Sequence, residues 1–134
     1  MSTNVSFTKE NPDTCLQKLA KEFRRLNGTK MPAEIVLIGG AAILVRYGFR
    51  DMTYDIDAII HSSSAMKDAI NTVGDELGLP NGWLNSDFAR TKLYSPKLVQ
   101  YSEYYKRFGH ILDVRIISRE YLVAMKLMSG RQYR

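Results

Sequence analysis

The feature that most restricts the fold is DIDAII at residues 55–60, an apolar run that carries two aspartates. Its β-branched residues predict a buried strand. Because side chains alternate along a strand, Asp55 and Asp57 project from one face and Ile56 from the other. Two carboxylates about 7 Å apart at Cα repel each other unless a cation lies between them. We therefore expect this strand to end at a cleft, where the carboxylate oxygens hold Mg²⁺.

A third carboxylate, Asp113, interrupts another apolar run, HILDVRII at residues 110–117. If the two strands are neighbours, three carboxylates converge on one sheet edge, which is the arrangement that two-metal phosphoryl or nucleotidyl transfer needs. The alternative is structural: Asp57 is solvated at a strand tip, and Asp113 pairs with Arg115 on its own face. Spacing alone leaves both interpretations open.

A glycine pair, Gly39-Gly40, ends the apolar run EIVLI at residues 34–38 and precedes a predicted helix over 41–47. Free backbone N–H groups and the helix dipole at such a junction favour a phosphate. Without a Cβ, the backbone can approach a triphosphate closely. The pair is a weak signal by itself, and it becomes informative when an acidic pair follows one helix later.

Periodicity and turn residues predict the other elements. The first three are a helix from Asp13 to a stop at Gly28 and strands over 34–38 and 55–60. A helix over 65–77, capped by the serines at 62–64, comes next. An antiparallel hairpin of KLVQYSEYY (97–105) and HILDVRII, with its turn at 106–109, is followed by a last helix from Ser118 to near Gly130. This order predicts an α+β (mixed α/β) domain with a small mixed sheet flanked by helices. We expect a flexible N-terminus over 1–12 and one domain over 13–134, truncated at its C-terminus.

Composition sets broad limits on the class of protein. A chain of 134 residues with 45% hydrophobic and 25% charged content suits one soluble globular domain. It has no apolar run of membrane-spanning length and no apolar segment typical of a secretory signal. The single cysteine, Cys15, fits a reducing cytoplasm and is interpreted as a packing residue. The net charge of +5 favours anionic partners, although the cations are scattered along the sequence.

Two motifs together resemble a known pattern: Ile38-Gly39-Gly40, followed after a helix by Asp55-Ile56-Asp57-Ala58. The pattern is that of the nucleotidyltransferases of the DNA polymerase β-like superfamily, with Asp113 matching their third carboxylate. Within the superfamily, GGAAILVRYGFRDMTYDID, GWLNSDF and LVAMKL look like the branch that includes the AbiEii-type toxins. The resemblance covers roughly residues 34–130.

The resemblance implies Mg²⁺-dependent transfer of a nucleoside monophosphate from an NTP to an acceptor, such as tRNA or a protein hydroxyl. It implies a toxin with an antitoxin partner, while the single cysteine and the lack of a long apolar run favour a cytoplasmic protein with no membrane association. It also assigns site residues: metal binding and catalysis to Asp55, Asp57 and Asp113, and nucleotide binding to Gly39, Gly40 and Lys126.

Two alternatives remain at this stage. Because the sequence stops at SGRQYR where relatives continue, the same fold could serve as a catalytically inactive nucleotide- or partner-binding module. An unrelated nucleic-acid binder rests on net charge alone. The tyrosines at 101, 104 and 105 could stack on RNA, but strands are rich in tyrosine for packing reasons as well. Trp83 is interpreted as a core residue.

Overall fold

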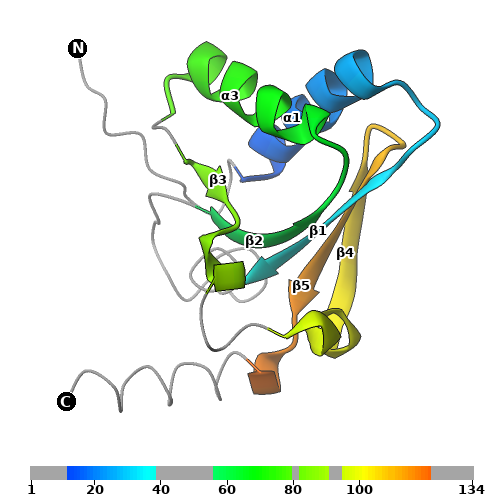
Figure 1. Ribbon diagram of the computed structural model, residues 1–134, viewed down its shortest axis with the longest axis vertical. Helices are drawn as coiled ribbons and strands as arrows, with labels where there is room; N and C mark the ends of the chain where they lie inside the picture. Colours follow the sequence, from blue (N-terminus) through cyan, green and yellow to red (C-terminus); the bar gives the residue numbers. More distant parts are fainter. Residues whose placement is uncertain (1–11, 39–55, 80–81, 91–94, 122–134) are drawn as a thin grey trace.

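The computed structural model describes residues 12–38, 56–79, 82–90 and 95–121 (Figure 1). Its elements are α1 (Pro12–Asn27), β1 (Ala33–Ile38), β2 (Ile56–His61), α3 (Ala65–Leu77), β3 (Leu84–Asn85), the 3₁₀ helices η1 (Asp87–Arg90) and η2 (Pro96–Tyr101), β4 (Ser102–Phe108) and β5 (Leu112–Ile117). The predicted helix over 41–47 lies outside the described residues, as does the last predicted helix beyond Tyr121.

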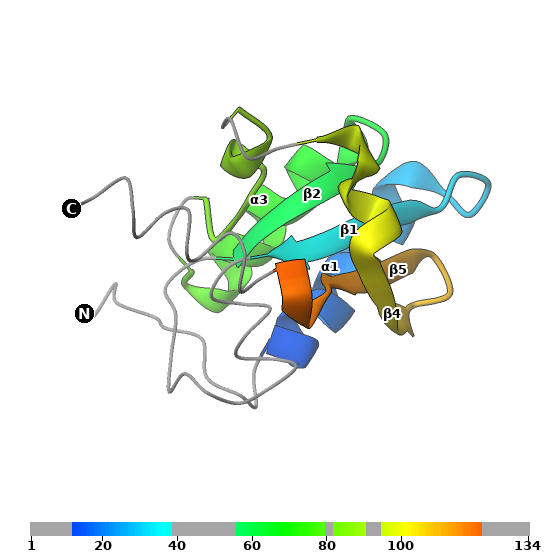
Figure 2. The same ribbon diagram turned by 90° about the horizontal axis from the view of Figure 1, so that it is seen from below.

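The strands form one five-stranded mixed sheet in the order β3-β2-β1-β5-β4. β1 pairs antiparallel with β2 and parallel with β5, while β4 pairs antiparallel with β5 and β3 runs parallel to β2. The helices α1 and α3 lie side by side on the same side of the sheet (Figures 1 and 2). The predicted α+β class with a small mixed sheet is therefore confirmed.

The core lies between the two helices and the central strand β1. Leu16, Leu19 and Phe23 recur at helical spacing on α1, and all three are fully buried. β1 is buried on both faces from Ile35 to Ile38, as expected of a central strand that reads as a continuous apolar run. Cys15 is also buried, which confirms it as a packing residue, and this burial raises the pKa of its thiol.

The β4–β5 hairpin differs from its prediction at both ends of β4. KLVQY does not extend the strand, because Pro96 begins a 3₁₀ helix whose first turn is capped by the Ser95 hydroxyl, which accepts from the Lys97 N–H at 3.2 Å. The turn lies after Phe108 instead of at residues 106–109. Gly109 and His110 both have positive φ, 58° and 57°, and these conformations set its position.

A two-residue strand, β3, lies between the predicted helix over 65–77 and the predicted hairpin, where the sequence predicted no strand. Its place depends on Trp83, whose backbone carbonyl accepts from the Ile56 N–H at 2.7 Å and whose Nε1–H donates to the Ile70 carbonyl of α3 at 2.8 Å. The Trp83 side chain is 1% exposed, so its interpretation as a core residue is confirmed. A strand this short has no periodicity by which the sequence could reveal it.

Gly74 of α3 gives a test of this packing. A Cβ built at Gly74 would lie 3.0 Å from Cδ1 of Trp83, which is too close for the indole to stay in place. Alanine favours a helix over glycine by up to about 1 kcal/mol. We nevertheless expect Gly74→Ala to lower the free energy of unfolding by about 1–3 kcal/mol, because overpacking a filled core costs more.

Urea unfolding followed by circular dichroism measures this change. Asn71→Ala is the matched control, because Asn71 lies exposed on the same helix, and its substitution should leave stability unchanged or slightly raised. A Gly74→Ala variant as stable as Asn71→Ala would contradict the tight contact with Trp83.

Candidate active site at one end of the sheet

Of the residues predicted for the site, the structure describes Asp57 and Asp113, and Asp57 is the one that lies near the end of β1 from which the glycine motif continues. It is the second residue of β2, half-buried, and its Cα partner in the antiparallel pair is Ile38, the last residue of β1. Its neighbours Ile56 and Ala58 are fully buried, so Asp57 occupies the opposite face of β2. The alternation predicted for DIDAII therefore holds over the described residues.

The pairing of Ile38 with Asp57 brings the first residue of the glycine motif beside the acidic motif of β2. Adjacent strands lie about 4.8 Å apart. Gly39 follows Ile38 directly in the chain, and Asp55 precedes Ile56, the first residue of β2. Gly39, Gly40, Asp55 and Lys126 themselves lie outside the described residues.

Asp113 lies at the other end of the sheet. Its Cα partner on β1 is Glu34, whereas that of Asp57 is Ile38. Four residues of strand separate these levels by about 13 Å, and β2 and β5 lie on opposite sides of β1. The residue of β5 that pairs nearest to the level of Asp57 is Ile116, opposite Leu37. The register therefore does not bring Asp113 to Asp57, and it argues against Asp113 as a shared metal ligand.

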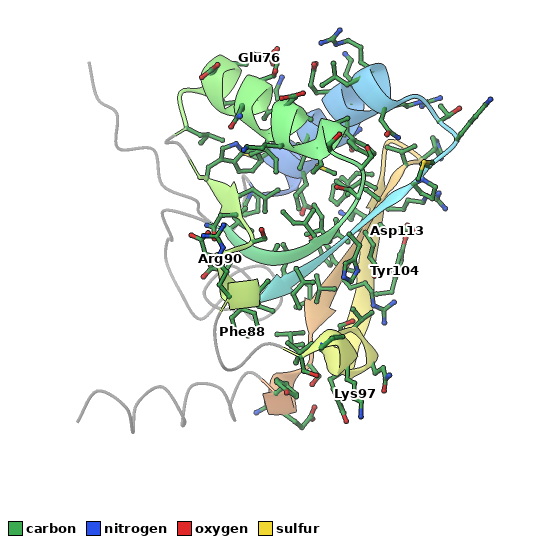
Figure 3. All side chains as sticks on the ribbon, viewed as in Figure 1. Glu76, Phe88, Arg90, Lys97, Tyr104 and Asp113 are labelled. Carbon is green, nitrogen blue, oxygen red and sulfur yellow. The ribbon has the colours of Figure 1, made fainter. Side chains whose placement is uncertain are left out.

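The ion-pair partner of Asp113 is not Arg115, the residue that the sequence suggested for a purely structural role of this carboxylate. Its Oδ1 lies 3.5 Å from Nε of Arg107 on β4, not against Arg115. Arg115 instead donates from Nε to the Ser102 hydroxyl at 2.7 Å and from a terminal nitrogen to the Ser102 carbonyl at 2.8 Å. In Figure 3, Asp113 lies with Tyr104 on the β4–β5 side of the molecule. Asp113 thus takes part in a half-exposed ion pair of the hairpin.

The donor chemistry at the Asp57 end suits a hard cation. Asp57 supplies a carboxylate, and the neighbouring position of β3 is an amide, Asn85, so oxygen ligands predominate there. Across the described ranges, no three His, Cys, Asp or Glu side chains gather closely enough to hold a metal ion.

Sequence reasoning missed Asn85, which pairs with Asp57 in the parallel β2–β3 ladder. Its amide is fixed at both ends: Nδ2 donates to the Gly82 carbonyl at 3.1 Å, and Oδ1 accepts from the Asp87 N–H at 3.1 Å. This is the local turn that asparagine side chains favour, and the Gly82–Asp87 spacing was the available signal. Asn85 thereby fixes the chain that enters η1 beside Asp57.

The strand order, the antiparallel β1–β2 pair and the carboxylate near the start of β2 define a nucleotidyltransferase-like α+β domain. Across residues 14–133 the chain matches the family described as a nucleotidyltransferase of unknown function (DUF6036), and it belongs to that family. The match does not extend to the AbiEii-type branch. Searches of curated proteins and of solved structures gave no match. No helix within the described segments has the length and apolar character needed to cross a membrane.

Asn85→Asp tests the turn beside the site. The substitution keeps the acceptor for Asp87 but replaces the donor to Gly82 with a carboxylate oxygen, so we expect a loss of about 1 kcal/mol in the free energy of unfolding. Urea unfolding measures it, with Ser86→Ala as the control, because Ser86 is the exposed next residue. If both variants unfolded alike, the Asn85 amide would not be holding this turn.

Proposed function

We propose that this chain is an Mg²⁺-dependent nucleotidyltransferase that transfers a nucleoside monophosphate from an NTP to a hydroxyl of an acceptor, an RNA such as tRNA or a protein. The pairing of Ile38 with Asp57 carries the proposal, because it puts the residue before the glycine pair beside the described carboxylate. Membership of a nucleotidyltransferase family supports the reaction class.

In this proposal, Asp55 and Asp57 hold the metal and Gly39-Gly40 contacts the triphosphate. Held by these two carboxylates, Mg²⁺ would supply charge neutralisation at the phosphates and a lowered pKa of the attacking hydroxyl. The half-buried position of Asp57 near a strand end is compatible with this role, because the paired strand fixes its backbone. Lys126 is proposed to lie near the nucleotide phosphates, as the resemblance to the toxin branch implies.

The proposed reaction forms a bond between the acceptor oxygen and the α-phosphorus of the NTP. The bond from the α-phosphorus to the bridging oxygen breaks, pyrophosphate leaves, and the hydroxyl proton passes to solvent. Asp113 is left out of this chemistry, because its level on the sheet is that of Glu34. A toxin role with an antitoxin partner rests on the resemblance to the AbiEii-type branch.

The position of Asp113 at the far end of the sheet favours a second candidate function. With Asp113 at the far end of the sheet, Asp57 is the one predicted carboxylate that the described residues put at this end, and Asp55 is assigned to it only through its place in the sequence. The alternative is a nucleotide- or partner-binding module without turnover. Calorimetry that showed NTP binding without label transfer would favour this second candidate.

The test of transfer is incubation of the protein with each α-labelled NTP, Mg²⁺ and either total RNA or total cell protein. We expect label to appear in one acceptor, and we expect Asp57→Asn and Asp55→Asn each to reduce it to background. Addition of EDTA should have the same effect, because the carboxylates need the cation to hold the triphosphate.

Asp113→Asn is the matched control, because it removes a carboxylate of the same size at the opposite end of the sheet. We expect this variant to keep transfer activity, with a change in stability of at most about 1 kcal/mol from loss of the half-exposed pair with Arg107. Transfer that survived Asp57→Asn and vanished with Asp113→Asn would overturn the assignment.

A further inference from the structure

The exposed face of α1 is basic. Lys18, Lys21, Arg24 and Arg25 are all exposed, while the apolar residues of the same helix point into the core. Lys18, Lys21 and Arg25 have the spacing i, i+3 and i+7, so they share one side of the helix. At a rise of about 1.5 Å per residue they extend over about 10 Å of its axis. Three of the scattered cations of the sequence are thus aligned on one side of α1.

This face continues onto the β4–β5 hairpin. Ala20 of α1 contacts the turn at Gly109, where an added Cβ would lie 3.1 Å from that of Ala20, and Arg24 donates to the Gly109 carbonyl at 3.4 Å. Two exposed cations of β4, Lys106 and Arg107, lie just before this turn in the chain. We call the set Lys18, Lys21, Arg24, Arg25, Lys106 and Arg107 the basic edge.

The charge of the basic edge is only partly offset. Three carboxylates pair with it: Glu22 with Arg25, Asp13 with Lys106 at 2.9 Å, and Asp113 with Arg107 at 3.5 Å. Six cations against these three paired carboxylates leave +3 within the set, and Glu76 of α3 also acts electrostatically on Arg25. Within the described residues, Lys18, Lys21 and Arg24 have no acidic partner in hydrogen-bond or ion-pair contact.

The neighbouring helix has the opposite charge. The exposed charges of α3 are Lys67 against Asp68, Asp75 and Glu76, a net charge of −2. Figure 3 shows Glu76 on the outer side of α3, away from the hairpin. The helix layer is therefore polarised, and its field would turn a polyanion away from α3 and toward the basic edge.

An exposed aromatic residue adjoins the basic edge. Tyr104 of β4 is 56% exposed, and it pairs with Arg115 on the face of the sheet away from the helices. Tyrosine in this setting can stack on an unpaired base, which structured RNAs present in loops and at ends. In duplex DNA the bases are paired, so stacking favours RNA over duplex DNA as the polyanion.

We propose that the basic edge binds the phosphate backbone of a structured RNA, with an unpaired base stacked on Tyr104. The hairpin turn follows Phe108, next to the Ala33 end of β1, whereas Asp57 is level with Ile38. The turn end of the basic edge therefore lies at the opposite end of the sheet from the candidate active site, whereas Tyr104, paired with Arg115, is level with Val36, two residues before Ile38 on β1. That this RNA is also the acceptor rests on the proposed function, whereas the binding itself does not.

Fluorescence anisotropy with a labelled RNA hairpin, measured in EDTA without NTP, tests the binding independently of catalysis. We expect Lys21→Glu with Arg24→Glu to weaken binding at least about 10-fold and to lower the slope of log affinity against log salt by about 2. Lys67→Glu on α3 is the control for a single charge reversal, the same change of −2 that Lys21→Glu makes alone on α1. Lys67→Glu should stay within about 2-fold of the original protein, whereas Lys21→Glu should weaken binding by more.

Tyr104→Ala tests the stacking contact. It should weaken binding of the RNA hairpin while leaving binding of a fully paired RNA duplex unchanged, because only the hairpin presents unpaired bases. Circular dichroism melting of each variant checks that the fold is retained.

Three results would overturn the proposal: no binding of the hairpin by the original protein, equal loss with Lys67→Glu, or competition by poly-glutamate as strong as by RNA. The last result would mean attraction to any acidic polymer, including an acidic protein. Loss of RNA binding with retained NTP-dependent labelling of protein would reject the RNA surface and leave the proposed transfer reaction intact.

Discussion

The levels of Asp57 and Asp113, the two predicted carboxylates among the described residues, depend on the hydrogen-bonded pairing of β1 with a neighbour on each side. β1 is buried on both faces, so the sheet cannot shift past it without exposing apolar side chains. Its antiparallel partner β2 brings Asp57 to the level of Ile38, and its parallel partner β5 brings Asp113 to the level of Glu34. Backbone pairing, more than any side-chain contact, decides which carboxylates can act together.

The sequence was sufficient for those parts of the fold that follow from local pattern. The continuous apolar run of β1 and the buried Trp83 were predicted and are confirmed, as is the apolar spacing of α1 except at Leu26, which is 41% exposed. The 3₁₀ helix η2 was missed because a Ser95-Pro96 start outweighed the strand character of the residues after it. β3 was missed because a strand of two residues is too short to show the alternation of apolar and polar side chains that marks a strand.

The level of Asp113 could not be predicted for a different reason. Alternation along a strand decides the face of a side chain, and Asp113 does share a face of the sheet with Glu34, its partner on β1. A slide of one strand by two or four residues, however, preserves every face. Only the packed core and the turns at Gly109 and His110 select the register, and these depend on contacts between segments far apart in the chain.

Trp83 has a consequence for how this domain can be studied. It is the only tryptophan of the chain, it donates to α3 through its indole, and it accepts from Ile56 through its backbone, one residue from Asp57. A single natural chromophore therefore connects the helix layer to the strand that carries the candidate carboxylate. Its emission reports directly, without any attached dye, on events at that end of the sheet.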